Sequence, residues 1–365
     1  MGVIGGGQLA RMMISPSVEL GLRLQVLAEA EDVSASLAAS AIGDHRDAEA
    51  VLAFAAGVEV VTFDHEHVPQ EVLRALLDAG ARVRPGPAAL AVAQDKILMR
   101  ERLSALGVPV PEWAVVDDAT GLSAFLDGRG EVIVKTPRGG YDGHGVRRVS
   151  EPEAIADWFA GGGSLLVEEL VPFRRELAQL VARRPSGEIA AWPLVETVQR
   201  DGVCVEVTAP APGADALAAE AVRIATLVAD RLDVTGVLAV ELFETVDGRL
   251  LVNELAMRPH NSGHWTIDGA VTSQFEQHLR AVLDLPLGDP SPRAPWSVMV
   301  NVLGGPPDGM TSRYPDAMAT VPAARFHAYG KDHRPGRKVG HVTVSGSDLA
   351  AVTADARAAA AFFDR

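Results

Sequence analysis

Residues 240–254 read VELFETVDGRLLVNE, and this stretch predicts a β-hairpin that turns at Asp247 and Gly248. A two-residue type I′ turn at these positions places Glu241 directly opposite Glu254 on the neighbouring strand. Like charges that face each other at a Cβ separation of about 5 Å destabilise a sheet unless a cation lies between them. Carboxylate oxygens, with phosphate completing the shell, are ligands that Mg²⁺ prefers. The hairpin therefore predicts a magnesium site built from Glu241 and Glu254.

An exposed sheet face is the alternative setting for these two glutamates, because a solvated carboxylate needs no metal. The side chains that we expect on the same face are apolar, which argues for partial burial. They are Ala239, Phe243, Val252 and Ala256. Partial burial favours the metal site.

A glycine-rich segment, VKTPRGGYDGHG (residues 134–145), follows a predicted strand that ends at Lys135. Glycines let backbone N–H groups approach phosphate oxygens, and a lysine supplies the compensating positive charge. The chain contains no G-x-x-x-x-G-K-[ST] sequence, so the segment is not a Walker A loop. A plain surface connection is the alternative. Together with the opposed carboxylates, the segment predicts the second half of a metal–nucleotide site.

The hairpin runs directly into a polar segment, NELAMRPHNSGHW (residues 253–265). Its side-chain donors are Arg258, His260, Asn261, Ser262 and His264. Donors at this density are costly in a core and expected in a binding site. A capped polar loop is the alternative, but it does not explain why the segment adjoins the carboxylates.

A second basic feature lies in residues 331–341, KDHRPGRKVGH. The chain has a formal net charge of −15, yet this loop gathers four cations around Asp332: Lys331, Arg334, Arg337 and Lys338. A local basic cluster in an acidic protein predicts a small anionic ligand, because nucleic acid requires a broad basic surface. A solvated basic loop is the alternative.

A glycine pattern near the N-terminus favours a different ligand. Gly5, Gly7 and Ala10 fit G-x-G-x-x-A, and Glu29 ends the next predicted strand, which is the pattern of a dinucleotide-binding turn. This pattern supports a nicotinamide-dependent oxidoreductase as an alternative function, although any tight turn into a helix favours glycine. The oxidoreductase leaves the opposed glutamates without a purpose.

The segment FDHEHVP (residues 63–69) places His65 and His67 on one face of a strand end, beside Glu66. Two imidazoles without a clear third ligand are more often a polar strand end than a zinc site, so we do not predict zinc here. The carboxyl end of a parallel strand is instead typical of a substrate crevice.

The composition limits the class of protein. A chain of 365 residues with 48% hydrophobic and 22% charged residues is typical of a soluble globular protein with two or three domains. The single cysteine, Cys204, is expected in a strand or a core, and no cysteine pair has metal-ligand spacing. The first residues lack the features of a signal peptide, and no window is apolar enough to span a membrane. We therefore expect a cytoplasmic protein that binds neither nucleic acid nor a membrane.

Changes of pattern along the chain divide it into three expected domains. Residues 1–92 alternate strands with helices, as in a parallel α/β sheet. Residues 93–285 mix helices with antiparallel hairpins, as in an α+β domain, with subdomains at 93–164 and 165–285. Residues 286–365 form a small domain that follows a proline-rich link.

In this order, the motifs resemble those of the ATP-grasp superfamily and, more closely, of the bacterial 5-(carboxyamino)imidazole ribonucleotide synthase family. The resemblance runs from residue 1 to about residue 345. It rests on GVIGGGQLARMM (2–13), VKTPRGGYDGHG, VNELAMRPHNSGHW with SQFEQHLRA (273–281), and RPGRKVGH (334–341). It implies an ATP-grasp fold with an N-terminal Rossmann-like (pre-ATP-grasp) domain and a small, β-rich C-terminal domain.

The resemblance also implies a reaction. ATP drives the carboxylation of 5-aminoimidazole ribonucleotide with bicarbonate, through carboxyphosphate, to N5-carboxyaminoimidazole ribonucleotide, ADP and phosphate in de novo purine biosynthesis. The implied cofactors are ATP and Mg²⁺, and the implied assembly is a homodimer.

The family pattern assigns roles to residues of this chain. It gives Glu241 and Glu254 the metal. It assigns the nucleotide to Lys96, Lys135, Gly140, Tyr141, Asp142, Gly143, His144, Gly145, Val146, Glu168, Glu169, Leu170, Val171, Glu176, Gln199, Asn253 and Glu254. It assigns the ribonucleotide to Gly7, Gln8, Leu9, Glu66, Tyr141, Arg258, His260, Asn261, Ser262, Lys331, Arg337 and Lys338, with help from His341. The residues expected to act in catalysis are Asp142, which would handle the amine proton, Arg258, Lys331 and Lys338.

Three positions depart from the family pattern. Lys96 stands where arginine is usual, which removes a bidentate contact to ATP. Gln199 replaces a histidine, and Met257 replaces a proline. Two further alternatives are a catalytically silent nucleotide-binding protein, which the retained carboxylates and Lys135 disfavour, and an ATP-grasp ligase with another acceptor, which RPGRKVGH disfavours.

Overall fold

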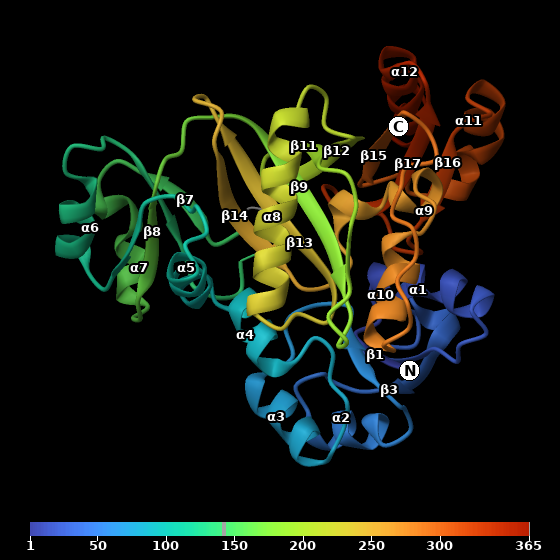
Figure 1. Ribbon diagram of the computed structural model, residues 1–365, viewed down its shortest axis with the longest axis horizontal. Helices are drawn as coiled ribbons and strands as arrows, with labels where there is room; N and C mark the ends of the chain where they lie inside the picture. Colours follow the sequence, from blue (N-terminus) through green and yellow to red (C-terminus); the bar gives the residue numbers. More distant parts are fainter. Residues whose placement is uncertain (141–143, 365) are drawn as a thin grey trace.

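The computed structural model describes residues 1–140 and 144–364, so the predicted residues Tyr141, Asp142 and Gly143 lie outside the described part of the chain. Figure 1 shows three bodies around a long central sheet: an N-terminal domain, a small subdomain to one side, and the C-terminal strands and helices at the far end of the sheet.

The N-terminal domain is a parallel sheet in the order β3-β2-β1-β4, as the alternation of strands and helices predicts. Its strands are β1 (Gly2–Ile4), β2 (Gln25–Ala28), β3 (Ala39–Ile42) and β4 (Val61–Phe63), and its helices are α1 (Gln8–Glu19), α2 (Ala48–Ala55) and α3 (Gln70–Asp78). The carboxyl ends of the strands meet at one edge, because all three strand pairs are parallel. This edge carries both N-terminal motifs.

Two helices, α4 (Pro87–Gln94) and α5 (Lys96–Ala105), lead into the small subdomain. Asp95 caps α5, since its side chain accepts hydrogen bonds from the backbone N–H groups of Ile97 and Leu98. The subdomain is an antiparallel sheet in the order β5-β8-β6-β7. Its elements are β5 (Trp113–Val116), α6 (Ala119–Leu126), β6 (Val132–Lys135), β7 (Val146–Val149), α7 (Ala156–Ala160) and β8 (Leu165–Glu169).

The central sheet has the order β14-β13-β9-β11-β12-β15-β17-β16, with β10 paired to β9. Its strands are β9 (Phe173–Arg183), β10 (Ile189–Ala191), β11 (Val195–Arg200), β12 (Val203–Ala209), β13 (Gly236–Thr245), β14 (Leu250–Ala256), β15 (Trp296–Leu303), β16 (Arg325–Ala328) and β17 (Lys338–Gly346). Antiparallel pairing of β12 with β15 joins the predicted ATP-grasp and C-terminal domains. Residues on both sides of the predicted boundary at residue 285 therefore share one continuous sheet.

Helices cover this sheet and link it to the N-terminal domain (Figure 1). They are α8 (Asp215–Arg231), α9 (Thr266–Gly269), α10 (Gln274–Val282), α11 (Tyr314–Thr320) and α12 (Leu349–Ala360). Ile224 and Val228 of α8 belong to a core that includes Leu238 and Leu242 of β13. Cys204 is buried in β12, as expected. No helix in the described part of the chain is long and apolar enough to cross a membrane.

The hairpin of β13 and β14 confirms the predicted pairing of Glu241 with Glu254 and corrects its turn. The turn holds three residues instead of two, since Thr245 N donates to Arg249 O at 2.9 Å and Gly248 has φ +81°. A β-bulge skips Asn253 and restores the alignment, because Glu241 pairs with Glu254 while the next residue, Leu242, pairs with Val252.

The bulge also changes which side chains share a face. Leu242 and Val252 pack together in the core beneath α8, so the prediction that Val252 lies on the face of Glu241 is wrong. Ala239 and Ala256 pack together in the core on the other side of the sheet. A two-residue turn would have kept Val252 on the same face as Glu241. The extra residue at the bulge turns the side chain of Val252 to the opposite face.

Candidate functional site

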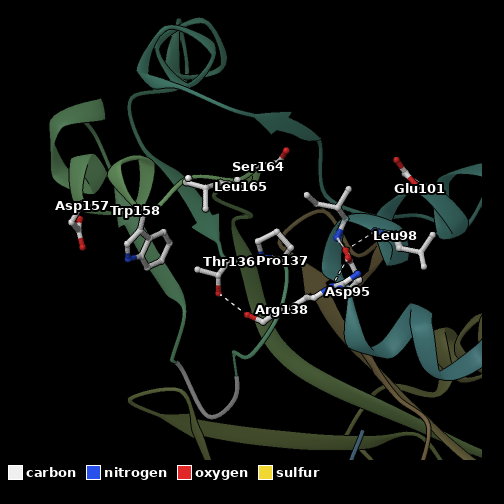
Figure 2. Close-up of a pocket in the computed structure, with 14 residues that line it drawn as sticks. Asp95, Leu98, Glu101, Thr136, Pro137, Arg138, Asp157, Trp158, Ser164 and Leu165 are labelled. Atoms are coloured by element: carbon white, nitrogen blue, oxygen red, sulfur yellow. Dashed lines mark hydrogen bonds and ion pairs between the residues drawn. The ribbon is translucent and has the colours of Figure 1, made fainter. Parts of the chain in front are cut away.

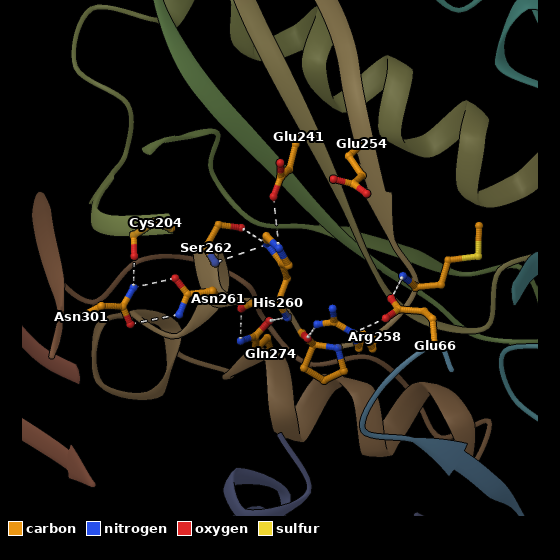
Figure 3. Close-up of polar contacts among 12 residues, drawn as sticks. Glu66, Cys204, Glu241, Glu254, Arg258, His260, Asn261, Ser262, Gln274 and Asn301 are labelled. Carbon is orange, nitrogen blue, oxygen red and sulfur yellow. Dashed lines mark hydrogen bonds and ion pairs between the residues drawn. The ribbon is translucent and has the colours of Figure 1, made fainter. Parts of the chain in front are cut away.

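The two opposed glutamates lie on the same side of the hairpin, and Figure 3 shows the contact of Glu241 with His260. Lys96 Nζ lies 2.9 Å from Glu254 Oε1, and His260 Nε2 lies 3.2 Å from Glu241 Oε1. The side chain of Glu254 is 42% exposed and that of Glu241 is 27% exposed. Both carboxylates can therefore still accept a ligand from the solvent side.

The charges around the hairpin set the protonation of its carboxyls. Burial would raise the pKa of Glu241, but the hydrogen bond from His260 and the nearby charges of Lys338 and Lys135 hold it below its usual value. Burial and the charge of Glu241 raise the pKa of Glu176 to about 7, against a hydrogen bond from Gln199. Glu241 is thus an anion at neutral pH, and Glu176 is partly protonated.

A buried ion cluster stands beside this pair. Glu168 on β8 is 3% exposed, and it accepts from Arg100 of α5 and from Lys135, whose Nζ lies 2.7 Å from Glu168 Oε2. Arg100 also donates to the backbone oxygen of Asn253 at 2.7 Å, and Lys135 donates to Asn253 Oδ1 at 3.2 Å. Both Glu168 oxygens already hold a cation, so this side chain positions Lys135.

Most of the remaining predicted nucleotide residues lie at the end of β8, directly after it, or in the glycine-rich segment between β6 and β7. Glu169 ends β8, where its Oε1 accepts from the Glu112 N–H at 3.0 Å, and Leu170 after it is exposed. Val171 is buried. Gly140, His144, Gly145 and Val146 border the undescribed part of the glycine-rich segment. The base of the segment is closed by a 2.9 Å bond from Thr136 N to Gly145 O.

The polar segment after Glu254 is braced from beneath by Gln274 (Figure 3). Gln274 Oε1 accepts from the His260 N–H at 2.8 Å, and Gln274 Nε2 donates to the His260 carbonyl at 2.7 Å. His260 Nδ1 lies 2.8 Å from Ser262 Oγ. Asn261 exchanges hydrogen bonds with Asn301 of β15. The structure thus brings His260, Asn261 and Ser262 together and holds them rigidly.

Glu66 and Arg258 connect the N-terminal domain to this polar segment. Arg258 Nε donates to Glu66 Oε2 at 2.6 Å, and the Met257 N–H donates to Glu66 Oε1 at 3.2 Å. Burial would raise the pKa of Glu66, but the charge of Arg258 and its hydrogen bond hold it below its usual value. Met257, which departs from the family pattern, supplies an N–H that proline lacks.

The basic loop reaches across to the N-terminal glycine turn. Lys331 Nζ lies 2.6 Å from Gln8 Oε1, so two residues predicted to bind the ribonucleotide are in contact over the domain boundary. Lys338 begins β17, and Arg337 is held by a 3.5 Å bond to the Asp332 carbonyl. His341 is fully buried and bonded to Tyr329 Oη at 2.8 Å, so it supports the loop from inside the fold.

The glycine turn before α1 is filled by a side chain of the protein itself. Asp64 Oδ1 accepts from the Ala10 N–H at 2.7 Å, and a Cβ at Gly7 would stand 2.0 Å from Asp64 Oδ2. Gly7 is therefore required by packing against Asp64. Leu9 is buried in the N-terminal core, so only its backbone can face a ligand.

A separate pocket of about 860 Å³ lies between α5, α7 and residues 136–138 (Figure 2). Its lining includes Leu98, Pro137, Trp158 and Leu165 and, within residues 1–140 and 144–364, no predicted site residue. Thr136 faces it while the preceding Lys135 points to Glu168, because successive side chains of an extended segment alternate. The pocket therefore lies behind the predicted nucleotide site.

Sequence reasoning missed four residues that shape the site: Arg100, Asp64, Gln274 and Asn301. A signal existed for Arg100, since it lies four residues after Lys96 and so shares its helix face. The other three act through contacts between distant segments, for which the spacing of residues gives no signal.

Three family models match consecutive parts of the chain. The ribonucleotide synthetase preATP-grasp domain matches residues 1–94, the ATP-grasp domain matches residues 101–275, and the phosphoribosylaminoimidazole carboxylase C-terminal domain matches residues 297–355.

Curated relatives match nearly the whole chain. The N5-carboxyaminoimidazole ribonucleotide synthase of Mycobacterium tuberculosis strain H37Rv is 53% identical over 371 residues, which cover 98% of this chain and 86% of the relative. The Corynebacterium ammoniagenes enzyme of the same name is 51% identical, with coverage of 99% and 91%.

Solved structures match the fold. N5-carboxyaminoimidazole ribonucleotide synthetase from Thermus thermophilus has a TM-score of 0.90 at 39% identity, covering 100% of this chain and 98% of the other. The Aspergillus clavatus synthase in complex with ADP and 5-aminoimidazole ribonucleotide has a TM-score of 0.90 at 31% identity, with coverage of 100% and 98%.

Proposed function

The chain belongs to the N5-carboxyaminoimidazole ribonucleotide synthase family, and from that premise we propose how its residues divide the work of the reaction. It is an ATP-grasp ligase of purine biosynthesis that makes N5-carboxyaminoimidazole ribonucleotide. The comparisons support this function over the nicotinamide-dependent oxidoreductase. The glycine turn agrees, because Asp64 occupies the helix N-terminus where a pyrophosphate would bind.

The opposed glutamates are the proposed Mg²⁺ ligands. Their donor set fits the ion, since two partly exposed carboxylates face each other from paired positions of one hairpin. Bound Mg²⁺ would neutralise charge on the ATP phosphates. Lys96 and His260, which contact the two glutamates, would then be available to the ATP phosphates and to bicarbonate, while Glu168 holds Lys135.

Bicarbonate is the proposed carbon donor. One of its oxygens attacks the γ-phosphorus of ATP, ADP leaves, and the product is carboxyphosphate. Breaking the bond between carbon and the bridging oxygen then releases phosphate, and the carbon becomes bonded to the amine of 5-aminoimidazole ribonucleotide. Arg258, His260 and Lys338 lie around the region proposed for this anion, where the two cations and the imidazole can stabilise developing charge by ionic and hydrogen-bonding contacts.

The ribonucleotide is proposed to lie between the glycine turn and the basic loop. The contact between Gln8 and Lys331 places both elements at one position, and Arg337 and Lys338 follow in the same loop. Arginine and lysine are suited to a 5′-phosphate. Asp142 remains the proposed group for the amine proton, although it lies outside the described residues.

The single observation that carries this proposal is the direct pairing of Glu241 with Glu254 beside Lys96 and His260. The test uses bicarbonate labelled with ¹⁸O, MgATP and 5-aminoimidazole ribonucleotide, with ADP and phosphate measured together. We expect ADP release that requires both small substrates and one ¹⁸O atom in each phosphate formed. Turnover without ¹⁸O transfer to phosphate would exclude carboxyphosphate as the intermediate. ATP binding without turnover would favour a catalytically silent nucleotide-binding protein.

The homodimer and the cytoplasmic location stay predictions. Light scattering after size-exclusion chromatography measures the first, with about twice the mass of one 38.4 kDa chain expected.

A further inference from the structure

We propose that Glu29, His45 and His65 form a second metal site, for a transition ion of the Zn²⁺ class, at the carboxyl edge of the N-terminal sheet. The site is distinct from the carboxylate pair of the central hairpin and goes beyond the proposed function. It gives a role to Glu29 and to His65 of the FDHEHVP segment, which the ligase reaction does not use.

Sheet topology brings the three residues together. Glu29 follows β2, His45 lies three residues after β3, and His65 lies two residues after β4. The sheet order is β3-β2-β1-β4 and all its strand pairs are parallel, so the three segments emerge at one edge. The sequence paired His65 with His67, whereas the fold replaces His67 with His45 and adds the missing third ligand.

The geometry suits a metal. One nitrogen from each imidazole and one carboxylate oxygen all lie within 4.8 Å of one another. His65 Nε2 lies 3.5 Å from Glu29 Oε1, and the two imidazole rings meet edge to face with centroids 4.6 Å apart. His45 Nδ1 and His65 Nε2 are buried and have no hydrogen-bond partner among the described residues. Two histidines and a carboxylate are a common ligand set for zinc.

The protonation states favour ligation. The neighbouring His65 lowers the pKa of Glu29 to about 2, so Glu29 is an anion at neutral pH. Burial lowers the pKa of His45, and its buried Nδ1 has no hydrogen-bond partner among the described residues. Glu29 Oε2 accepts from the Gly6 N–H at 3.1 Å, and a bond of this kind fixes the orientation of a ligating carboxylate.

Metal binding requires one local change. His65 Nδ1 accepts from the His67 N–H at 3.2 Å, so a neutral His65 carries its proton on Nε2, facing Glu29. A metal at Nε2 moves that proton to Nδ1 and breaks the bond from His67. One neutral hydrogen bond is a small loss against three metal–ligand bonds. The change also gives the site a spectroscopic signature at His65 and His67.

A metal at this site would stabilise the glycine turn, next to the proposed position of the ribonucleotide. Glu29 holds the backbone of Gly6, and Gln8, two residues further on, contacts Lys331. A metal that fixes Glu29 thereby fixes the glycine turn that faces the basic loop.

The test uses the full chain after removal of metal, titrated with Co²⁺ in excess Mg²⁺, which occupies the carboxylate pair. Tetrahedral Co²⁺ with nitrogen ligands gives strong visible absorption, unlike octahedral Co²⁺ with oxygen ligands. We expect one such ion per chain. His45→Gln, His65→Gln and Glu29→Gln should each weaken binding at least about tenfold. His67→Gln is the matched control, because its ring stacks on His65 with centroids 5.2 Å apart but lies outside the ligand group.

A second measurement does not depend on the variants folding. In the unaltered chain, imidazole ¹⁵N spectra should show that one equivalent of Zn²⁺ shifts His65 Nε2 and protonates His65 Nδ1. Absence of tetrahedral Co²⁺, binding equally weakened by His67→Gln, or unchanged His65 resonances would each overturn the proposal. Glu29 and His65 would then form only an ion pair.

Discussion

Two acidic regions meet at Asn253, and they differ in burial and in the side chains that contact their carboxylates. Glu241 and Glu254 are partly exposed beside His260 and Lys96, whereas Glu168 is buried between Arg100 and Lys135. Arg100 and Lys135 also bind the backbone and side chain of Asn253, next to Glu254. Burial and contact partners, and not charge alone, therefore distinguish a ligand site from the residues that support it.

The largest expected effect is on activity, from Glu254→Gln. The change removes the negative charge of one proposed metal ligand, so kcat should fall about 10³-fold or more. The free energy of unfolding should change by less than about 1 kcal/mol, because Glu254 is partly exposed and the amide oxygen can still accept from Lys96. Steady-state ADP release and urea unfolding measure the two quantities. Glu220→Gln, on the surface of α8, is the control and should change neither. A large loss of stability in Glu254→Gln would make the hairpin glutamate part of the scaffold.

The next effect is on stability, from Arg100→Met. It leaves Glu168 buried with only Lys135 of the two cations described here, so the free energy of unfolding should fall by about 3–5 kcal/mol. The triple variant Arg100→Met, Lys135→Met and Glu168→Met should recover much of this loss, because it removes the buried carboxylate together with both of its partners. Urea unfolding tests both, with Arg223→Met at an exposed ion pair as the control. If all three variants lose the same free energy of unfolding, the buried ion cluster of Glu168 is no more important for stability than an exposed ion pair.

A smaller effect concerns the basic loop. Lys338→Ala should raise the KM for 5-aminoimidazole ribonucleotide about 10- to 100-fold, since a charge-assisted hydrogen bond contributes about 1.5–3 kcal/mol. Arg334→Ala, in the same loop but without an assigned role, should change the KM less than about twofold, by the size of a surface substitution. If both variants raise the KM equally, the loop acts through its overall charge.

The last effect is a pH dependence at His278, compared between pH 7 and 5. This side chain is buried and neutral, whereas Glu168 is buried and charged. Burial lowers its pKa from 6.5 to about 3, with bonds to Thr62 and Val237. Between pH 6.5 and pH 3, His278 is protonated in the unfolded chain but neutral in the folded chain. The contribution of His278 to the free energy of unfolding is therefore greatest above pH 6.5. It then falls by about 1.4 kcal/mol per pH unit toward pH 3. His278→Gln should reduce this slope by one proton in urea unfolding between pH 7 and 5.

The sequence predicts which residues belong to the site better than it predicts how they are arranged. Alternation, the hairpin and the polar segment indicate the right fold class, because these patterns are local. The pairing of Glu241 with Glu254 is correct although its predicted turn is not, since a longer turn and a bulge at Asn253 compensate. The pairing of Arg100 with Glu168, and the insertion of Asp64 at Gly7, depend on contacts between distant segments.

Mn²⁺ binding in the presence of ADP, followed by electron paramagnetic resonance, tests the assignment of the metal site to Glu241 and Glu254 most directly. The unaltered chain and Glu220→Gln should bind the metal–nucleotide tightly, while Glu241→Gln and Glu254→Gln should lose most of that binding and remain folded. Unchanged Mn²⁺ binding in both hairpin variants would contradict the assignment of the opposed glutamates as the metal site.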